Sequence, residues 1–139
     1  MRVILFVIVT LSFAVGIAYA QGRKGQMHGM PHYNTAAEVT LLGTITKVDT
    51  HMGRMGWKGT HLVVSFDAET LDVHVGPSKY VAQQAFSFSA GEQIQVTGSR
   101  IKFEGSDVLI AREIKKGEQV LTLRNSQGIP VWSRNRWRY

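Results

Sequence analysis

The chain has 139 residues, a formal net charge of +6 and no cysteine. That length suits a single domain with one core, and the lack of thiols excludes disulfides, thiolate metal sites and covalent haem attachment. The core must therefore be held by packing alone.

The first twenty residues have the features of a signal peptide. Arg2 gives a positive start, residues 3–15 are mostly apolar, and Ala18-Tyr19-Ala20 places small residues where a signal peptidase reads them. We expect cleavage after Ala20 and a periplasmic or secreted protein. The alternative is an uncleaved anchor, because residues 3–20 carry no charge and reach the lower limit of length for spanning a bilayer.

Residues 21–36 form a leader without hydrophobic periodicity, which predicts a flexible segment. The barrel domain is expected over residues 37–132, followed by a basic, aromatic tail over residues 133–139. Removal of Arg2 with the signal peptide lowers the net charge to +5. The remaining excess lies mainly at the two ends of the chain, so the body of the domain is close to neutral.

The domain opens with strand patterns. A long strand is expected over residues 38–50, where apolar and threonine residues alternate. Gly43, with a change of phase at Val48, predicts a bulge or bend in that strand. Residues 49–60 contain three glycines and are expected to form a loop. A hairpin follows, with strands at 61–66 and 71–75 and a turn over residues 67–70.

The second half begins with a short helix. Pro77 is suited to a helix start, and we expect the helix over residues 78–86. A segment this short is not stable alone, so it must cover the core. Strands are then expected at 94–97, with an extension to 103, and at 108–114, followed by a short apolar run at 120–123.

This order of elements predicts the fold class. Three strands, one helix and two strands is the order of the OB-fold, a small Greek-key barrel. We therefore expect a mainly β protein with a five- to six-stranded OB-like barrel and one short helix. The ligand surface of such barrels lies on strands two and three and on the loops after strands one and four.

Nucleic acid is disfavoured as a ligand. Stacking of bases needs aromatic side chains beside basic ones. The outward positions of the predicted hairpin hold no phenylalanine, tyrosine or tryptophan. The tail does interleave the two kinds of residue, through Arg134, Arg136 and Arg138 between tryptophans and a tyrosine. The tail predicts one of two things. It makes peripheral contact with an anionic membrane or cell-wall polymer, or it is a chain terminus without a binding role, with Trp132 packed on the barrel.

Two clusters of thioether and imidazole side chains suggest a metal. Such ligands suit Cu(I) better than zinc or magnesium. Residue types of this kind resemble those of small periplasmic copper-binding barrels, which use one histidine, two methionines and a nearby tryptophan, and copper is the cofactor that this resemblance implies. The alternative is that Met52 and Trp57 only cover the barrel end. The candidate ligands are Met27, His28, Met30 and His32 in the leader and His51, Met52 and Met55 in the loop.

A ligand surface without metal is the other interpretation of the same region. Arg54 and Trp57 in the loop, with His61 and His74 on the outward face of the hairpin, would contact a small ligand or an envelope protein. As single residues, His61 and His74 are more often solvated strand residues than metal ligands. Asp67, Glu69 and Asp72 cluster near the hairpin turn and are expected to be solvated. No nucleophile with a base and an orienting group is recognisable, so we expect no enzyme.

Several motifs carry a further resemblance. The segments 74–80 (HVGPSKY), 91–99 (GEQIQVTGS), 110–117 (IAREIKKG) and 121–132 resemble a family of small exported bacterial proteins with a domain similar to that of the magnetosome proteins MamS and MamX. The resemblance implies an envelope location and a β-barrel domain. In MamX-type proteins it implies redox and iron handling through separate haem motifs, which this cysteine-free chain lacks.

The sequence thus predicts a non-enzymatic exported binding or accessory module, associated with metal or redox handling in the envelope. The two alternatives are a Cu(I) or Ag(I) carrier that uses the methionine and histidine loop, and an anionic-surface-binding protein that uses its basic tail. The oligomeric state and the identity of the ligand stay open.

Overall fold

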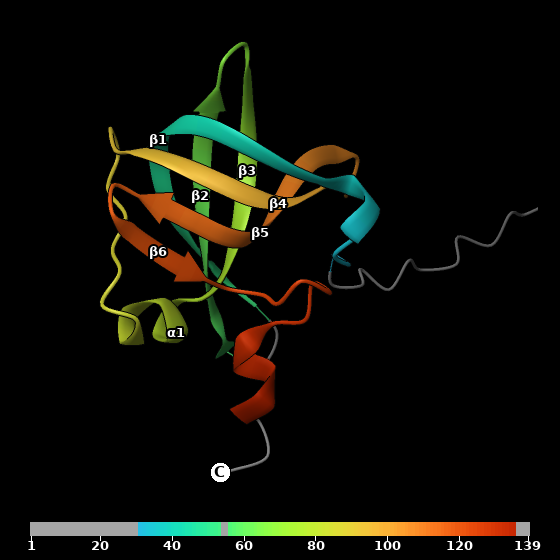
Figure 1. Cartoon of the computed structure of the whole chain (residues 1–139), viewed down its shortest axis with the longest axis vertical. Coiled ribbons are helices and arrows are strands. Elements are labelled where there is room, and N and C mark those ends of the chain that lie inside the picture. The colour runs from blue at the N-terminus through green and yellow to red at the C-terminus, as the bar shows by residue number, and fades with distance from the viewer. Residues whose placement is uncertain (1–30, 54–55, 136–139) are drawn as a thin grey trace, which may run out of the picture.

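The computed structural model describes residues 31–53 and 56–135, and this part of the chain forms a barrel of antiparallel and parallel strands (Figure 1). The six strands, in order, are β1 (Glu38–Met52), β2 (Lys58–Phe66), β3 (Glu69–Pro77), β4 (Gln93–Phe103), β5 (Ser106–Lys116) and β6 (Gln119–Thr122). The helical segments are η1 (Thr35–Ala37), α1 (Ser78–Gln83) and η3 (Val131–Asn135).

The strand order closes the sheet into a barrel. Neighbouring strands follow the order β3-β2-β1-β4-β5-β6, and β3 also pairs with β5 in parallel. That last pairing joins the two ends of a five-stranded sheet and leaves β6 as an additional strand beside β5. With α1 between β3 and β4, this is the OB arrangement that the order of elements predicted. The predicted fold class is confirmed.

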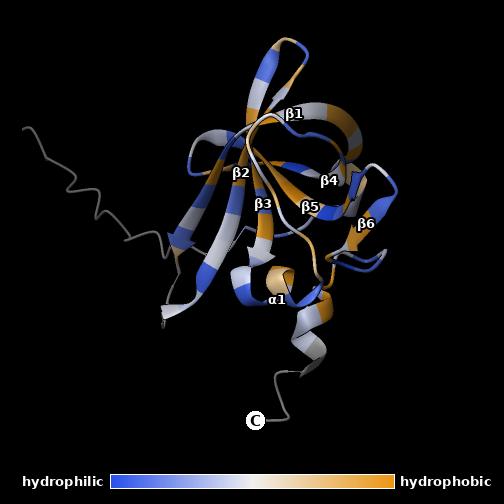
Figure 2. Ribbon diagram, turned by 90° about the vertical axis from the view of Figure 1, so that its left-hand side faces the viewer, coloured by the Kyte–Doolittle hydropathy of each residue, from blue (hydrophilic) through white to orange (hydrophobic). Residues whose placement is uncertain are grey.

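The core comes from the inward side of each strand. Along β2 and β3, buried apolar residues alternate with partly exposed ones, as a strand with one covered face requires. Figure 2 shows the same alternation of apolar and polar residues along the ribbons. Four successive residues near the start of β5, Val108 to Ala111, are buried, because this stretch is covered on both sides.

The helix is shorter than the sequence predicts. It spans Ser78–Gln83, and Ala85 then adopts a φ of 52°, a left-handed conformation that ends the helical path. Phe86 therefore lies outside the helix but is still buried, together with Val81. The segment covers one end of the barrel, as expected for a helix that cannot stand alone (Figure 1).

Of two expectations about β1, one is wrong and one is confirmed. The segment expected as a loop over residues 49–60 is mostly strand, because β1 continues to Met52 and pairs with β2 from Lys58 onward. Backbone hydrogen bonding rather than burial extends this hairpin, so no apolar alternation marks it. The bulge predicted in β1 is confirmed, because the register with β2 shifts between Ile45 and Lys47, inside the stretch from Gly43 to Val48. Gly43 itself permits a close approach, since a Cβ there would lie 2.6 Å from the side chain of Phe66.

The ends of the described chain contact the barrel. Asn34 donates its backbone N–H to Ser99 Oγ at 3.0 Å, and Tyr33 donates its hydroxyl to Glu38. Trp132 in η3 packs against the core and contacts Tyr80, with the rings tilted by 51° and their centroids 5.3 Å apart. The predicted signal peptide over residues 1–20 lies outside the described residues. Within the described part, no helix is long and apolar enough to cross a membrane.

Candidate metal centre

Three polar side chains meet on the outer face of β2 and β3. His61 lies on β2, and Asp72 and His74 lie on β3. Their strand neighbours Leu62 and Val73 are buried, so alternation directs these three side chains outward. One potential metal-binding atom from each of the three lies within 4.8 Å of the other two.

The register of the hairpin brings the three residues together. Phe66 pairs with Glu69, so the turn holds only two residues, and Asp67 adopts a φ of 46° within it. Counting back from that turn places His61 directly opposite His74. Asp72 is two residues from His74 and therefore shares its face.

The distances suit metal coordination. Asp72 Oδ2 lies 3.3 Å from His61 Nδ1 and 3.4 Å from His74 Nε2. Charge-assisted hydrogen bonds are normally shorter, at about 2.7–2.9 Å. In a tetrahedral site with bonds of about 2.0–2.1 Å, two ligand atoms stand about 3.3 Å apart. The carboxylate oxygen is thus already at the separation from both imidazoles that such an ion requires.

The carboxylate of Asp72 is ionised at neutral pH. Partial burial opposes its charge, but hydrogen bonds and attraction from His61 and His74 outweigh that effect and hold the pKa of this carboxyl well below its usual range. The imidazoles are mostly sheltered, with side-chain exposures of 19% for His61 and 15% for His74. The site therefore combines a permanent negative charge with two partly sheltered nitrogen donors.

Two further side chains border the site. Phe103, at the end of β4, meets His74 edge to face at a ring-centroid distance of 5.9 Å and an interplanar angle of 84°. On the other side, the ring of His51 on β1 lies 4.4 Å from that of His61. The β1–β2 hairpin and the end of β4 therefore flank the cluster, which is where OB barrels hold their ligands.

Some of the residues singled out in the sequence lie here and others do not. His51, His61 and His74 come together, whereas Met52 and Trp57 are exposed on the β1–β2 hairpin. His32 is exposed in the segment before η1. Of Arg134 only the backbone is described. The candidates that lie outside the described residues are Met27, His28, Met30, Arg54, Met55, Arg136 and Arg138.

Asp72 was missed as a site residue. The sequence placed it with Asp67 and Glu69 among solvated carboxylates, but Glu69 accepts from Arg100 at 2.6 Å and Asp72 binds the two histidines. The available signal was the Asp-x-His spacing of Asp72 and His74, which sets both on one face of a strand. A third ligand on the neighbouring strand completes the pattern.

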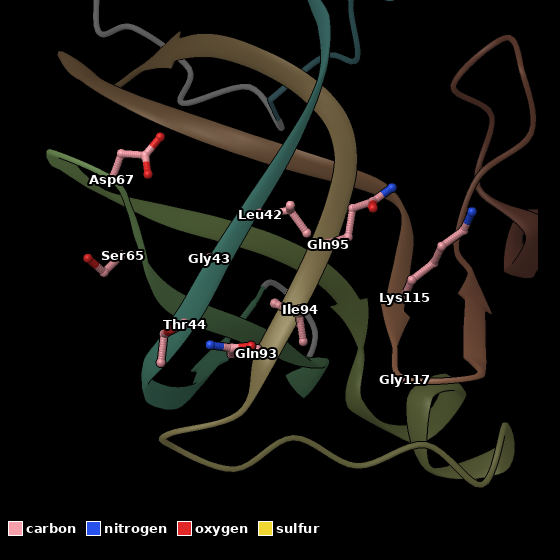
Figure 3. Close-up of a pocket in the computed structure, with 10 residues that line it drawn as sticks. All are labelled: Leu42, Gly43, Thr44, Ser65, Asp67, Gln93, Ile94, Gln95, Lys115 and Gly117. Atoms are coloured by element: carbon pink, nitrogen blue, oxygen red, sulfur yellow. The ribbon is translucent and has the colours of Figure 1, made fainter.

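A separate pocket opens elsewhere on the barrel surface (Figure 3). Its volume is about 640 Å³, and it gathers no histidine and no pair of carboxylates. Figure 3 shows residues of β1 and β4 side by side along it, in agreement with the pairing of Leu42 with Gln95. Its lining residues are Leu42, Gly43, Thr44, Ser65, Asp67, Gln93, Ile94, Gln95, Lys115 and Gly117.

Comparison with known proteins identifies the family. Residues 37–121, which run from the end of η1 into β6, match the model of the MamS/MamX magnetosome protein family. No curated protein matches the chain. The matched segment covers more than half of the sequence and includes His51, His61, Asp72 and His74. On this match, the chain belongs to the MamS/MamX magnetosome protein family.

Proposed function

We propose that this protein is an exported, non-enzymatic accessory module of the cell envelope that binds one divalent transition-metal ion through His61, Asp72 and His74. Two imidazoles and one carboxylate are suited to borderline ions such as Zn²⁺, Co²⁺, Ni²⁺ and Cu²⁺. Magnesium and calcium favour sites made of oxygen ligands only. The family match and the signal-like first twenty residues support an accessory role in the envelope.

The observation that carries this proposal is the spacing of the donor atoms. Both imidazole nitrogens stand 3.3–3.4 Å from one carboxylate oxygen, the separation of ligands around a tetrahedral ion. The three ligands also come from one rigid hairpin whose inner face is fully packed. Binding of an ion would require little rearrangement of the strands, so little conformational entropy would be lost on binding.

Metal titration of the purified exported protein tests the proposal. We expect one Zn²⁺ per chain at micromolar free metal, measured by calorimetry and by elemental analysis after gel filtration. The double variant His61→Ala/His74→Ala should retain none. His32→Ala, which changes an exposed histidine that is not part of the cluster, is the matched control and should bind as the original protein does. An original protein that retains no metal would overturn the proposal.

A Cu(I) arm in the same experiment separates the carrier alternative. Met52 follows His51 on β1, and successive strand residues point to opposite faces. Binding of Cu(I) that survives His61→Ala/His74→Ala but is lost in Met52→Leu would favour the methionine and histidine carrier. Export is tested by N-terminal sequencing of the periplasmic fraction, where we expect a chain that begins at Gln21.

A further inference from the structure

His51 is placed to extend the cluster from a third strand. In the β1–β2 register Asp49 pairs with His61, and His51 pairs with Gly59. His51 therefore shares the outer face with His61 and is its diagonal neighbour across the two strands. The two imidazole rings are 4.4 Å apart at their centroids, with an interplanar angle of 61°.

The residue that pairs with His51 in the register is a glycine, Gly59, which lies two residues before His61 on β2. A Cβ at Gly59 would lie 3.7 Å from Nε2 of His61, so the ring of His61 lies close to the space that a side chain at this position would occupy. No side chain from Gly59 occupies the gap that separates His51 from the cluster. The absence of a side chain leaves the space beside the ring of His61 open to the side chain of His51.

The imidazole of His51 is weakly held. Its side chain is 58% exposed, and besides the ring of His61 its polar neighbour among the described residues is Asp49, whose Oδ2 lies 4.0 Å from Nε2. That separation is too long for a hydrogen bond. Exposed side chains change rotamer on the picosecond to nanosecond scale. His51 can therefore turn toward an ion without giving up a strong interaction.

We propose that His51 becomes the fourth protein ligand when the ion binds, which rests on the metal site of the proposed function. The complete site then has three imidazoles and one carboxylate, the number of ligands that closes a tetrahedral zinc site. The ion links β1 to β3 across β2, so the β1–β2 hairpin is tied to the barrel when metal is present. Without His51 the ion has three protein ligands, and water molecules fill the remaining positions, which lets the ion take more than four ligands.

Cobalt substitution tests the coordination number. The exported protein loaded with Co²⁺ should show the intense visible bands of a four-coordinate ion. In His51→Ala we expect the weaker bands of a higher-coordinate, hydrated ion. We also expect Zn²⁺ affinity to fall at least about 10-fold, since mutation of a residue that only hydrogen-bonds to a metal ligand already lowers metal affinity by about that factor. Met52→Ala, a change of the adjacent exposed residue, is the matched control and should alter neither.

Chemical modification of the original protein gives a second, independent readout. Diethyl pyrocarbonate modifies accessible histidines, and mass spectrometry reports each site. Zn²⁺ should protect His51 together with His61 and His74 and leave His32 as reactive as before. Protection of His61 and His74 alone, with His51→Ala unchanged in affinity and spectrum, would overturn the role of His51 and keep the metal site. No protection and no retained metal would overturn both.

Discussion

His61 on β2 and His74 on β3 stand directly opposite each other, with ring centroids 4.2 Å apart and planes tilted by 49°. Both imidazoles approach the same oxygen of Asp72. Two basic groups at this distance repel each other once both are protonated, and the carboxylate between them offsets that repulsion. The arrangement therefore depends on one acidic side chain.

Removal of that carboxylate charge should affect metal binding more than folding. Asp72 is partly exposed, so we expect Asp72→Asn to change the free energy of unfolding by less than about 1 kcal/mol. We expect Zn²⁺ affinity to fall at least about 10-fold. Calorimetric titration and urea denaturation measure the two effects. Asp67→Asn at the exposed turn is the matched control, and equal loss of affinity there would contradict the assignment of Asp72.

Gly98 should not tolerate a side chain. A Cβ at this position would lie 2.3 Å from the carbonyl oxygen of Ile110, where β4 pairs with β5 at an irregularity in their register. Gly98→Ala must push the two strands apart, and we expect a destabilisation of about 3 kcal/mol. The midpoint of urea denaturation measures it.

The control for that change is another strand glycine. At Gly59 a Cβ would meet its nearest atoms at 3.7–3.8 Å, which is ordinary contact. We expect Gly59→Ala to leave the denaturation midpoint nearly unchanged. If the two variants were equally stable, the close approach of β4 to β5 at Gly98 would not limit the fold.

Tyr33 should make stability fall at alkaline pH. Burial, and then the hydrogen bond to Glu38 and its charge, raise the pKa of Tyr33 to about 12. A raised pKa means that the contribution of the neutral phenol is fully present below the usual value of about 10. It is lost as pH rises from about 10 through about 12.

Comparison with Tyr33→Phe isolates this effect. The original protein should be more stable than the variant at pH 8, because its hydroxyl donates to Glu38, which also accepts from Arg112 at 2.8–2.9 Å. That advantage should shrink at pH 11. Urea midpoints of both proteins at the two pH values measure it, and a difference that stays constant would argue against the Tyr33–Glu38 bond.

Arg124 should be needed for the packing of the C-terminal segment. Its guanidinium donates to the carbonyl oxygens of Val75 and Ala111 and lies 5.1 Å from the ring centroid of Trp132. Burial lowers the pKa of Arg124 to about 10, so the group is still charged at neutral pH. These contacts join β3, β5 and η3 through one side chain.

Substitution of Arg124 tests that role. Arg124→Ala leaves two carbonyls without this donor and removes the stacking on Trp132, and we expect a loss of about 2 kcal/mol. Arg124→Lys should recover less than half of it, because an ammonium lacks the planar fork. Urea midpoints and the tryptophan emission maximum measure both. Full recovery by lysine would show that charge alone suffices.

Much of the fold could be predicted from local patterns. The alternation of Leu62, Val64 and Phe66 indicates a strand with one buried face, because side chains of a strand point to opposite sides. Pro77 marks the start of the helix for a similarly local reason, since it lacks the N–H that the first turn leaves unpaired. Where the reason was not local, as in the extension of β1 to Met52, the prediction was wrong.

The candidate site also has a part that local sequence patterns predict and a part that they do not. The sequence by itself determined that His61 and His74 lie on outward faces of adjacent strands. It predicted a turn over residues 67–70, and a four-residue turn would have paired His61 with Gly76. The tertiary structure decided the register, because Asp67 takes a positive φ and shortens the turn to two residues. A shift of register moves every cross-strand pair together, so that one turn determines whether His61, Asp72 and His74 meet.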